Sequence, residues 1–475
     1  FEDQHPVQKH SVSISGGNKD VKYFLSGSYD NQVGIIKANP DVFQKYNLRS
    51  KLDFNINKYV KMSNNTSYYA SSYKYPGVGD VQNAFAYSAR HALAAFPLKN
   101  PDGSWVYSTP MISGNYNVAN GRHIVYGNDK NLNLDMYNDF TNTTEIKITP
   151  VKNFDIVANF TYRHYTTSYT NRQTKFDYRV YPGEEMQYYT TGAGEDKLSE
   201  TVKKYNYLSG NVYATYDNTF NEAHHLTAMA GMNLESWNSK SVKAVGKNIL
   251  SEDLNDLNLV GQSPTGEILT EVSGGQNAYK LMGFFARVNY DWKERYMLSA
   301  SLRYEGSSRF GANHKWGYFP AVSLGWRLSD EPWMQSASSW LNDLKVRYDY
   351  GVTGNQDFGN YQSLATYRSF GYYEYQGERF KVWGPSKNVN ADLRWEKGHN
   401  QNFGVDFSMF NHRLSGSLNY FLRYQTDLLG EYDVPVPPNL FNKIYANVGT
   451  MRNQGFEFDI TVNPIRKDNF NWDIT

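Results

Sequence analysis

The chain has no cysteine among its 475 residues. This absence excludes structural disulfides, cysteine-ligated zinc and thiol nucleophiles together. The chain also lacks any run of the roughly 18–20 apolar residues that a membrane-spanning helix needs. Its 48 basic and 47 acidic residues nearly cancel, so no excess of positive charge marks a surface for nucleic acid. These absences argue against a disulfide scaffold, a helical membrane protein and a nucleic-acid-binding protein.

Aromatic residues are abundant in a chain that is hydrophilic on average. Phe, Trp and Tyr make up 16% of the residues, with 40 tyrosines, and the mean hydropathy is −0.67. These two values rarely occur together in a soluble enzyme. A β-barrel in a membrane accounts for both, because half of each strand faces water and long polar loops dilute the lipid-facing half.

The clearest structural pattern lies between Tyr279 and Trp326. Its first part alternates with period two, and one face carries the apolar residues Met282, Phe284, Ala286, Val288, Tyr290 and Trp292. A short break at Lys293-Glu294-Arg295 precedes a second alternating part, which opens into the long polar segment 306–315. Apolar residues toward lipid, polar residues toward a lumen and aromatic residues at the ends are typical of transmembrane β-strands.

The same pattern recurs along the chain in roughly 16 strand-like segments. An open sheet of so many twisted strands normally curls, and closure removes its edges. We therefore predict an all-β fold, a large antiparallel transmembrane β-barrel with short turns on one side and long extracellular loops on the other.

Several segments interrupt this pattern. We expect two strands at Tyr207–Tyr216 and Leu226–Trp237. The expected loops are 75–128, 239–276 and 354–400, and the expected helical segments are 81–95 and a part of 329–340.

Seven motifs, spread over nearly the whole chain, occur in the order in which one family carries them. They are Val12–Gly17 with Tyr23–Ser26, Arg303–Gly311, Trp316–Pro320, Gly325–Arg327, Tyr350–Gln356, Arg394–Lys397 and Asn447–Glu457. The chain resembles the SusC-like TonB-dependent transporters of Bacteroidota outer membranes. Glu305 is a departure, because the family more often has Asp at that position.

The resemblance implies that residues 1–475 are a partial barrel domain. The family's barrel has 22 strands, of which this fragment would hold roughly 16, and an N-terminal plug fills it. A SusD-like surface lipoprotein would cover the barrel as a lid, and TonB with ExbB and ExbD would energise import. We expect the signal peptide, the carboxypeptidase-like N-terminal domain, the TonB box, the plug and the last strands to be absent from this chain.

Most residues of these motifs are interpreted as structural. A substrate contact at Ser307-Ser308-Arg309-Phe310 is the alternative to a loop anchor in which a carboxylate holds Arg309, and we favour the anchor. The segment 351–356 lacks the Lys-Ser/Thr of a phosphate-binding loop, so we expect a turn. The residues given this mainly structural role are Gly306, Ser307, Ser308, Arg309, Phe310, Gly354, Asn355, Gln356, Arg452, Asn453 and Gly455.

The two long aromatic insertions hold the candidate contacts for a substrate or a lid. These residues are Trp105, Tyr107, Tyr372, Tyr373, Tyr375 and Trp383. Aromatic faces stack on sugar rings and also pack against protein partners. The alternative is that they only fold the loops or belong to the interfacial aromatic belt. Charged residues on the predicted lumenal face could also bind polar cargo, but they more often pair with one another or with a plug; they are Arg287, Asp291, Arg303, Arg347 and Asp349.

No residues have the spacing of a catalytic or cofactor site. His224 and His225 are adjacent and would point to opposite faces of a strand, so they are poor joint metal ligands. The run from Asp253 to Asn258 lacks the glycine and the terminal Glu of an EF-hand loop, and loop calcium is kept only as an alternative. We predict no enzymatic activity and no cofactor.

The sequence thus predicts a barrel in the bacterial outer membrane, surrounded by lipid, that actively imports oligosaccharides with a SusD-like lid outside and TonB inside. Oligopeptide import is the alternative within the family, because aromatic sites suit both cargoes. A passive porin is the main alternative from another class, and it would need neither plug nor lid. A barrel enzyme would need an acid pair or a triad, and an adhesion module would not need amphipathic strands with aromatic ends.

Overall fold

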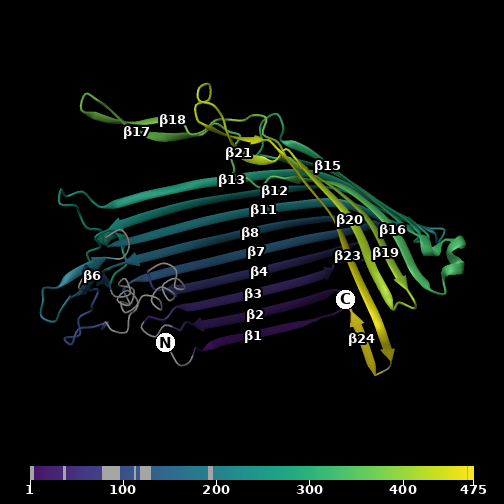
Figure 1. Cartoon of the computed structure of the whole chain (residues 1–475), viewed down its shortest axis with the longest axis horizontal. Coiled ribbons are helices and arrows are strands. Elements are labelled where there is room, and N and C mark those ends of the chain that lie inside the picture. Colours follow the sequence, from purple (N-terminus) through teal and green to yellow (C-terminus); the bar gives the residue numbers. More distant parts are fainter. Residues whose placement is uncertain are drawn as a thin grey trace.

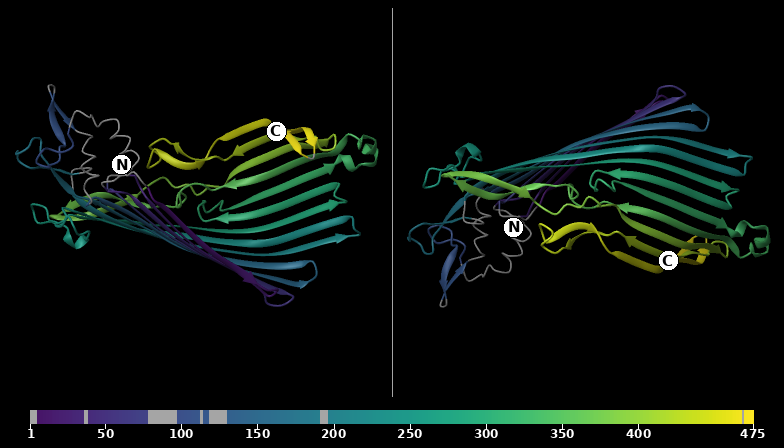
Figure 2. Two further views of the ribbon diagram at one scale, coloured as in Figure 1. Left: turned by 90° about the horizontal axis from the view of Figure 1, so that it is seen from below. Right: turned by 90° about the horizontal axis from the view of Figure 1, so that it is seen from above.

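A computed structural model describes residues 5–35, 39–77, 97–111, 114–117, 130–190, 196–467 and 469–475. Sixteen strands form one antiparallel sheet in the order β1-β2-β3-β4-β7-β8-β11-β12-β13-β14-β15-β16-β19-β20-β23-β24. The sheet curls into an open trough in which β1 and β24 are the outermost strands (Figures 1 and 2). The predicted all-β fold and its count of wall strands are confirmed.

The wall strands follow one another along the chain. They are β1 (Val7–Gly17), β2 (Val21–Val33), β3 (Val42–Asn55), β4 (Val60–Tyr75), β7 (Leu132–Val151), β8 (Phe154–Gln173), β11 (Lys197–Phe220), β12 (His224–Lys247), β13 (Thr270–Trp292), β14 (Tyr296–Ser307), β15 (Trp316–Arg327), β16 (Leu341–Asn355), β19 (Glu396–Met409), β20 (Leu414–Thr426), β23 (Thr450–Lys467) and β24 (Phe470–Ile474).

Short hairpins and 3₁₀ helices occupy the connections. In the described part of the chain the hairpins are β5 (Ser108–Met111) with β6 (Gly114–Asn117), β9 (Lys175–Tyr178) with β10 (Gln187–Thr190), β17 (Tyr367–Tyr375) with β18 (Glu378–Pro385), and β21 (Leu429–Asp433) with β22 (Lys443–Asn447). The 3₁₀ helices are η2 (Leu257–Leu259), η3 (Leu328–Asp330) and η4 (Pro332–Ala337). None of the helices among the described residues has the length and apolar character needed to cross a membrane.

The two edges of the trough differ in their connections. At one edge, only Lys293, Glu294 and Arg295 separate β13 from β14, and residues 221–223 separate β11 from β12. At the other edge, residues 356–395 connect β16 to β19 and residues 427–449 connect β20 to β23. We call these the turn edge and the loop edge. The predicted asymmetry of short turns and long loops is confirmed.

The apolar stripe predicted for residues 282–292 lies on the outer face of the sheet. Phe284 and Val288 are 43% and 41% exposed there. Their register partners on β14 are Tyr304 and Ala300, and antiparallel partners share a face. The alternation therefore continues from strand to strand as one apolar surface, which is the surface predicted to meet lipid.

Two belts of stacked aromatic rings frame this outer surface. At the turn edge, Tyr296 stacks with Trp292 and Trp326 at centroid distances of 5.4 and 6.1 Å. Toward the loop edge, Tyr304 stacks with Trp316 at 4.6 Å. The eight steps from Phe284 to Trp292 span about 27 Å along the strand. At a tilt of about 40° this is a height of about 20 Å, comparable to the roughly 25 Å apolar band of an outer-membrane barrel.

The turn between β15 and β16 is fastened to the turn-edge belt by Glu331. The Tyr296 hydroxyl and the Trp326 indole N–H donate to its carboxylate at 2.6 and 2.9 Å. These donors, with Tyr296 contributing most, hold the pKa of Glu331 below its usual range. The short helix expected within 329–340 is confirmed as the 3₁₀ helices η3 and η4.

The inner face of the sheet carries paired charges. Arg303 lies 2.7 Å from Glu305 on the same strand. Arg347 contacts Asp349 at 3.8 Å and Asp406 at 3.1 Å, so the expected pairing of these lumenal residues is confirmed.

The two adjacent histidines of β12 do diverge as predicted. His225 lies 3.0 Å from the lumenal carboxylate of Asp291. His224 instead lies 2.7 Å from the Tyr290 hydroxyl on the outer face. They cannot act as joint metal ligands.

The strands at the loop edge are longer than the sequence pattern indicated. β11 begins at Lys197 rather than at Tyr207, β12 continues to Lys247, and β13 begins at Thr270. The predicted loop 239–276 is therefore wrong at both ends. The predicted loop 354–400 is likewise interrupted by β17 and β18, and the helix-like run 81–95 lies outside the described residues.

The outer face can be tested with a charge at its centre. We expect Val288→Arg to destabilise the folded barrel by about 2–4 kcal/mol, because an arginine near the bilayer midplane loses its hydration. In the matched variant Asn289→Arg, the new side chain points into the lumen. We expect it to lower the stability of the barrel by about 1 kcal/mol, since it removes one hydrogen bond with Ser299. Denaturant titration of barrels refolded into lipid vesicles would measure both values. Equal costs would show that the two faces are assigned the wrong way round.

Candidate functional site

The motifs of the loop edge meet in one buried cluster, which we call the rim cluster. It consists of Phe310, Phe319, Val352, Leu393 and Trp395. These side chains come from the β14–β15 loop, from β15, from β16 and from the β16–β19 loop. Segments that are far apart in the sequence are therefore packed together where the wall of the trough meets its loops.

Aromatic contacts dominate the rim cluster. Phe310 is 1% exposed, and its ring centroid lies 4.7 Å from that of Trp395 and 5.2 Å from that of Phe358. Leu429 and Tyr445, from the β21–β22 hairpin, pack against the same group. The cluster thus fixes three successive loops against one another.

Gly354 is required by the closeness of this packing. A Cβ at this position would meet the Phe319 ring at 2.4 Å and the Trp395 ring at 2.9 Å. Its neighbours in the motif make local turns, because the Asn355 side chain accepts a hydrogen bond from the Asp357 amide at 2.9 Å. The turn predicted for 351–356 is therefore wrong for most of the segment, because β16 continues to Asn355 and the chain turns only after it.

Arg309 is held differently from our expectation. Its guanidinium donates to the Gln356 carbonyl at 2.8 Å and lies 4.4 Å from the centre of the Tyr279 ring. The expected carboxylate partner is therefore replaced by a carbonyl and an aromatic face. The backbone of the same motif is also tied down, since the Ser308 amide donates to the Lys280 carbonyl and the Ser308 hydroxyl accepts from the Lys280 amide at 2.9 Å.

The remaining motif residues of this group, Gly306 and Ser307, end β14 just before the β14–β15 loop. Gly306 lies directly under the Trp316 ring, which a Cβ would meet at 2.7 Å. Ser307 is 2% exposed, and its amide donates to the Lys315 carbonyl at 3.0 Å.

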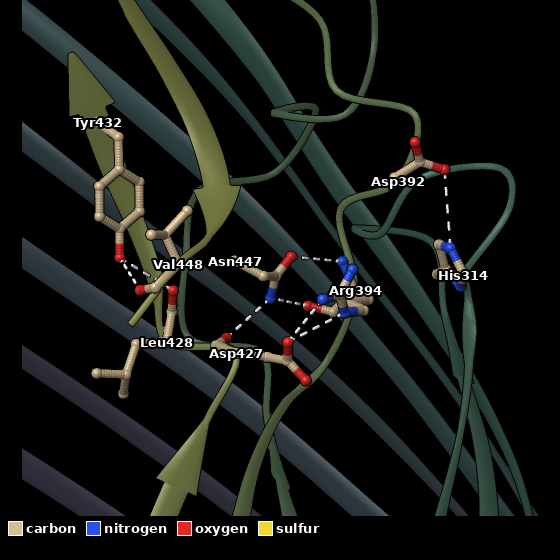
Figure 3. Close-up of polar contacts among 8 residues, drawn as sticks. All are labelled: His314, Asp392, Arg394, Asp427, Leu428, Tyr432, Asn447 and Val448. Carbon is tan, nitrogen blue, oxygen red and sulfur yellow. Dashed lines mark hydrogen bonds and ion pairs between the residues drawn. The ribbon is translucent and has the colours of Figure 1, made fainter. Parts of the chain in front are cut away.

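A second set of contacts links the β16–β19 and β20–β23 loops through polar groups (Figure 3). Arg394 pairs with Asp427 at 2.7 Å. Asn447 accepts from the Arg394 amide at 2.9 Å and donates to the carbonyls of Arg394 and Asp427 at 2.7 and 2.9 Å. The Tyr432 hydroxyl bonds to the Val448 carbonyl and closes the base of the β21–β22 hairpin.

Three motif residues on β23 lie away from the rim cluster. Arg452 donates to Gln454 at 2.6 Å on its own strand. Asn453 is the register partner of Arg423, and Gly455 is the register partner of Phe421. The structure therefore divides the motif residues into those that join the loops and those that belong to the wall.

The aromatic residues of the first insertion are folded into it. Trp105 and Tyr107 pack against Phe176, which is 5% exposed. Lys99 lies 4.1 Å above the Trp105 ring, and Tyr107 meets Tyr178 edge to face at 5.2 Å. These contacts agree with the alternative in which Trp105 and Tyr107 fold the loop.

Asp102 closes the turn beside Trp105. Its carboxylate accepts from the Ser104 hydroxyl at 2.6 Å and from the Ser104 amide at 3.0 Å, and it pairs with Arg179 at 2.8 Å. These contacts, with the Ser104 hydroxyl first among them, hold the pKa of Asp102 well below its usual range. Asp102 thereby joins the insertion to Arg179, which directly follows β9.

The aromatic residues of the second insertion stand in the open. They lie on the β17–β18 hairpin, which projects past the loop edge (Figure 1). One face carries Tyr373, Tyr375, Phe380 and Val382, since Tyr373 and Phe380 are register partners and side chains alternate along a strand. Tyr373 is 58% and Phe380 is 54% exposed. We call this the aromatic face of the hairpin.

The other face of the hairpin is more polar. Glu374 and Arg379 form an ion pair at 2.8 Å. Tyr372 and Lys381 are register partners beside them, and the Lys381 ammonium lies 5.2 Å from the centre of the Trp383 ring. The four candidate aromatic residues of this insertion are therefore split between the two faces.

Loop residues near the proposed calcium run have other contacts. Asp253 pairs with Lys130, and Asp256 accepts from the Asn258 amide at 2.9 Å as the cap of η2. Among the residues that the structure describes, no group of three His, Asp or Glu side chains is placed to hold a metal ion.

One buried ion pair was not anticipated from the sequence. Arg172 is 0% exposed and pairs with Asp196, while its guanidinium also donates to the carbonyls of Lys197 and Ser251 at 3.3 and 3.2 Å. It connects the end of β8, the start of β11 and the β12–β13 loop. The only available signal was a charged residue in a strand pattern, which does not reveal burial.

Comparison with known proteins agrees with this geometry. Residues 250–475 match the family described as "TonB dependent receptor-like, beta-barrel". TonB-dependent receptor P39 of Formosa agariphila is 29% identical over 97% of this chain and 41% of its own length. TonB-dependent receptor SusC of Bacteroides thetaiotaomicron is 25% identical over 98% of this chain and 46% of its own length.

Solved structures share the fold. The RagAB peptide importer in its open-open state superposes with a TM-score of 0.79 at 23% identity, over 98% of this chain and 49% of that chain. The chain thus spans less than half the length of the curated relatives named above. Together these similarities support a β-barrel of the SusC-like TonB-dependent kind in a bacterial outer membrane.

Proposed function

We propose that the complete receptor imports oligosaccharides through this barrel, with energy from TonB and with a SusD-like lipoprotein as a lid. The observation that carries the proposal is the aromatic face of the β17–β18 hairpin, which stands unpacked at the loop edge. Tyr373, Tyr375 and Phe380 present their rings there, where an arriving cargo or a lid would first make contact. The chain described here would supply the wall and the loops.

The lumen supports transport rather than catalysis. Its charges are paired on the wall, as in Arg303 with Glu305 and Arg347 with Asp406. Paired charges keep a wet lumen hydrophilic without fixing a cargo tightly, which is what passage requires.

Oligopeptide is the second candidate cargo. Two observations favour it. The chain is similar in structure to the RagAB peptide importer. Aromatic rings also pack on peptide side chains as well as on sugars. Calorimetric titration of the purified receptor–lid complex with defined oligosaccharides and peptides would separate the two. Heat from peptides alone would overturn the oligosaccharide proposal.

Energy dependence separates an importer from a porin. We expect uptake of a fluorescent oligosaccharide by cells that carry the complete receptor to stop when TonB is deleted. Uptake that continues at the same rate without TonB would identify a passive pore.

The hairpin provides a direct test of lid contact. We expect Tyr373→Ser with Phe380→Ser to weaken binding of the lid lipoprotein by about tenfold or more, because aromatic anchors are typical hot spots of protein interfaces. The matched control is Glu374→Gln with Arg379→Gln on the opposite face, where an exposed ion pair contributes little. Affinity measured by surface plasmon resonance with the complete receptor would compare them. An unchanged affinity in the aromatic variant would place the lid elsewhere.

A further inference from the structure

An apolar groove crosses the outer face of β8, β11, β12 and β13 where the apolar band ends toward the loop edge. Its volume is about 680 Å³, and its walls include Phe160, Leu208, Leu234 and Met282. Gly210 forms part of its floor, where an added Cβ would meet nothing closer than the Asn159 carbonyl at 3.8 Å. The groove therefore exists because a glycine stands between larger apolar residues.

The groove faces the lipid rather than the lumen. Gly210 is the register partner of Phe160 and Leu234, and Leu234 is the register partner of Met282. These residues share a face with Phe284, two positions beyond Met282 on β13, in the apolar stripe described above. Phe160 and Leu234 are 52% and 47% exposed, so acyl chains of the surrounding leaflet have access to them.

Two lysines stand at the loop-edge end of the groove. Lys280 is the next outward-facing residue of β13 after Met282, and Lys315 directly precedes Trp316; both line the groove. Both side chains are exposed. We call Lys280 and Lys315 the lower pair.

Two further lysines lie beyond them on the same face. Lys204 and Lys240 are register partners on β11 and β12, and both are exposed. Lys204 is four residues beyond Leu208, which is about 13 Å along the strand. We call Lys204 and Lys240 the upper pair.

Among the described residues, none of these four lysines forms an ion pair. No carboxylate in the described part of the chain lies within 4 Å of the ammonium of any of them. Like charges directly opposite each other on neighbouring strands, as at Lys204 and Lys240, are destabilising. An anion from outside the protein would remove that repulsion.

A second groove on the outer face provides a comparison within the same molecule. It has a volume of about 520 Å³ and is lined by Val12, Ile14, Leu25, Leu48 and Tyr68 with their neighbours. No lysine lines it. Arg49 does line it, but Arg49 alternates with the outward-facing Leu48 and so belongs to the inner face of β3. Apolar grooves therefore occur on this wall without lysines, and the lysines distinguish the first one.

We propose that the lysine-rimmed groove binds an anionic lipid of the outer leaflet, a phosphorylated glycolipid whose acyl chain lies over Gly210 and whose phosphates meet the lysines. Lysine binds phosphate as a point charge, and basic residues at the membrane surface attract anionic headgroups. The two lysine pairs are separated by about 13 Å along the strands. That separation exceeds the size of a single phosphate headgroup and fits a headgroup built on sugar rings.

The experiment uses the complete receptor in detergent. Native mass spectrometry would compare binding of phosphorylated lipid A with binding of the phosphate-free form that has the same acyl chains. We expect the phosphorylated lipid to bind more tightly, and Lys280→Gln with Lys315→Gln to weaken it by about fivefold for each lysine removed. Gly210→Leu, which fills the groove and leaves the lysines in place, is expected to weaken both lipids.

The control removes two lysines from the turn edge, Lys58→Gln with Lys293→Gln, and is expected to leave lipid binding unchanged. Heat-modifiable migration in gels would show that every variant is folded. Equal binding of the two lipids to the unchanged receptor would overturn the proposal, and so would an equal loss in the turn-edge control. Displacement of the lipid by the lid lipoprotein would assign the groove to that protein instead.

Discussion

Replacing Phe310 with alanine is expected to cost about 3–5 kcal/mol of the stability of the loop edge, because a fully buried ring is lost and a cavity remains. The ring is 1% exposed and packs on Trp395 and Phe358. Since the rim cluster joins three loops, the loss should appear as faster hydrogen exchange in 308–315, 390–395 and the β21–β22 hairpin. The wall strands should keep their protection.

Phe380→Ala is the matched control for this change. It removes the same side chain from a position that is 54% exposed on the β17–β18 hairpin. We expect hydrogen exchange at the rim cluster to stay as it was in this variant. Comparable effects of the two alanines on the three loops would mean that the rim cluster does not hold them.

Asp196→Asn should produce a loss of similar size at a different place. The change leaves the guanidinium of Arg172 charged and buried without its counter-ion, and breaking a buried pair in this way costs about 3–5 kcal/mol. Arg172 also bonds to the Lys197 and Ser251 carbonyls. We therefore expect faster hydrogen exchange at 196–198 and 248–251, measured on the complete receptor.

A double variant separates the effect of leaving a buried charge unpaired from the effect of changing the packing. Arg172→Met with Asp196→Leu removes both charges and keeps apolar volume, and such replacements are often neutral or stabilising. We expect the double variant to be more stable than Asp196→Asn alone. If it were the less stable of the two, the ion pair would have to contribute net stability in this environment.

The sequence predicted the wall well where one face meets lipid. Between Phe284 and Trp292, the outer residues must be apolar and the inner ones polar, so period two appears directly in the sequence. Beyond the lipid, both faces meet water and the pattern disappears. That is why the sequence pattern predicts a loop at 239–247 and 270–276, although these residues continue β12 and β13.

The candidate site was only partly predictable. The motif around Phe310 was recognised, but its burial depends on Leu393 and Trp395, about 80 residues later in the chain. Likewise Trp105 packs against Phe176, whereas Tyr373 is 58% exposed. Composition makes the two aromatic insertions look alike, and only tertiary contacts separate them.

The length of β11 and β12 determines how far the wall extends beyond the membrane. Each strand has 24 residues, about 80 Å at 3.4 Å per residue, and a tilt of about 40° leaves a height of about 60 Å. An apolar band of about 25 Å accounts for less than half of it. On this side the wall extends about 35 Å beyond the apolar band, so a cargo of the proposed import would meet the wall well before it reached the depth of the membrane.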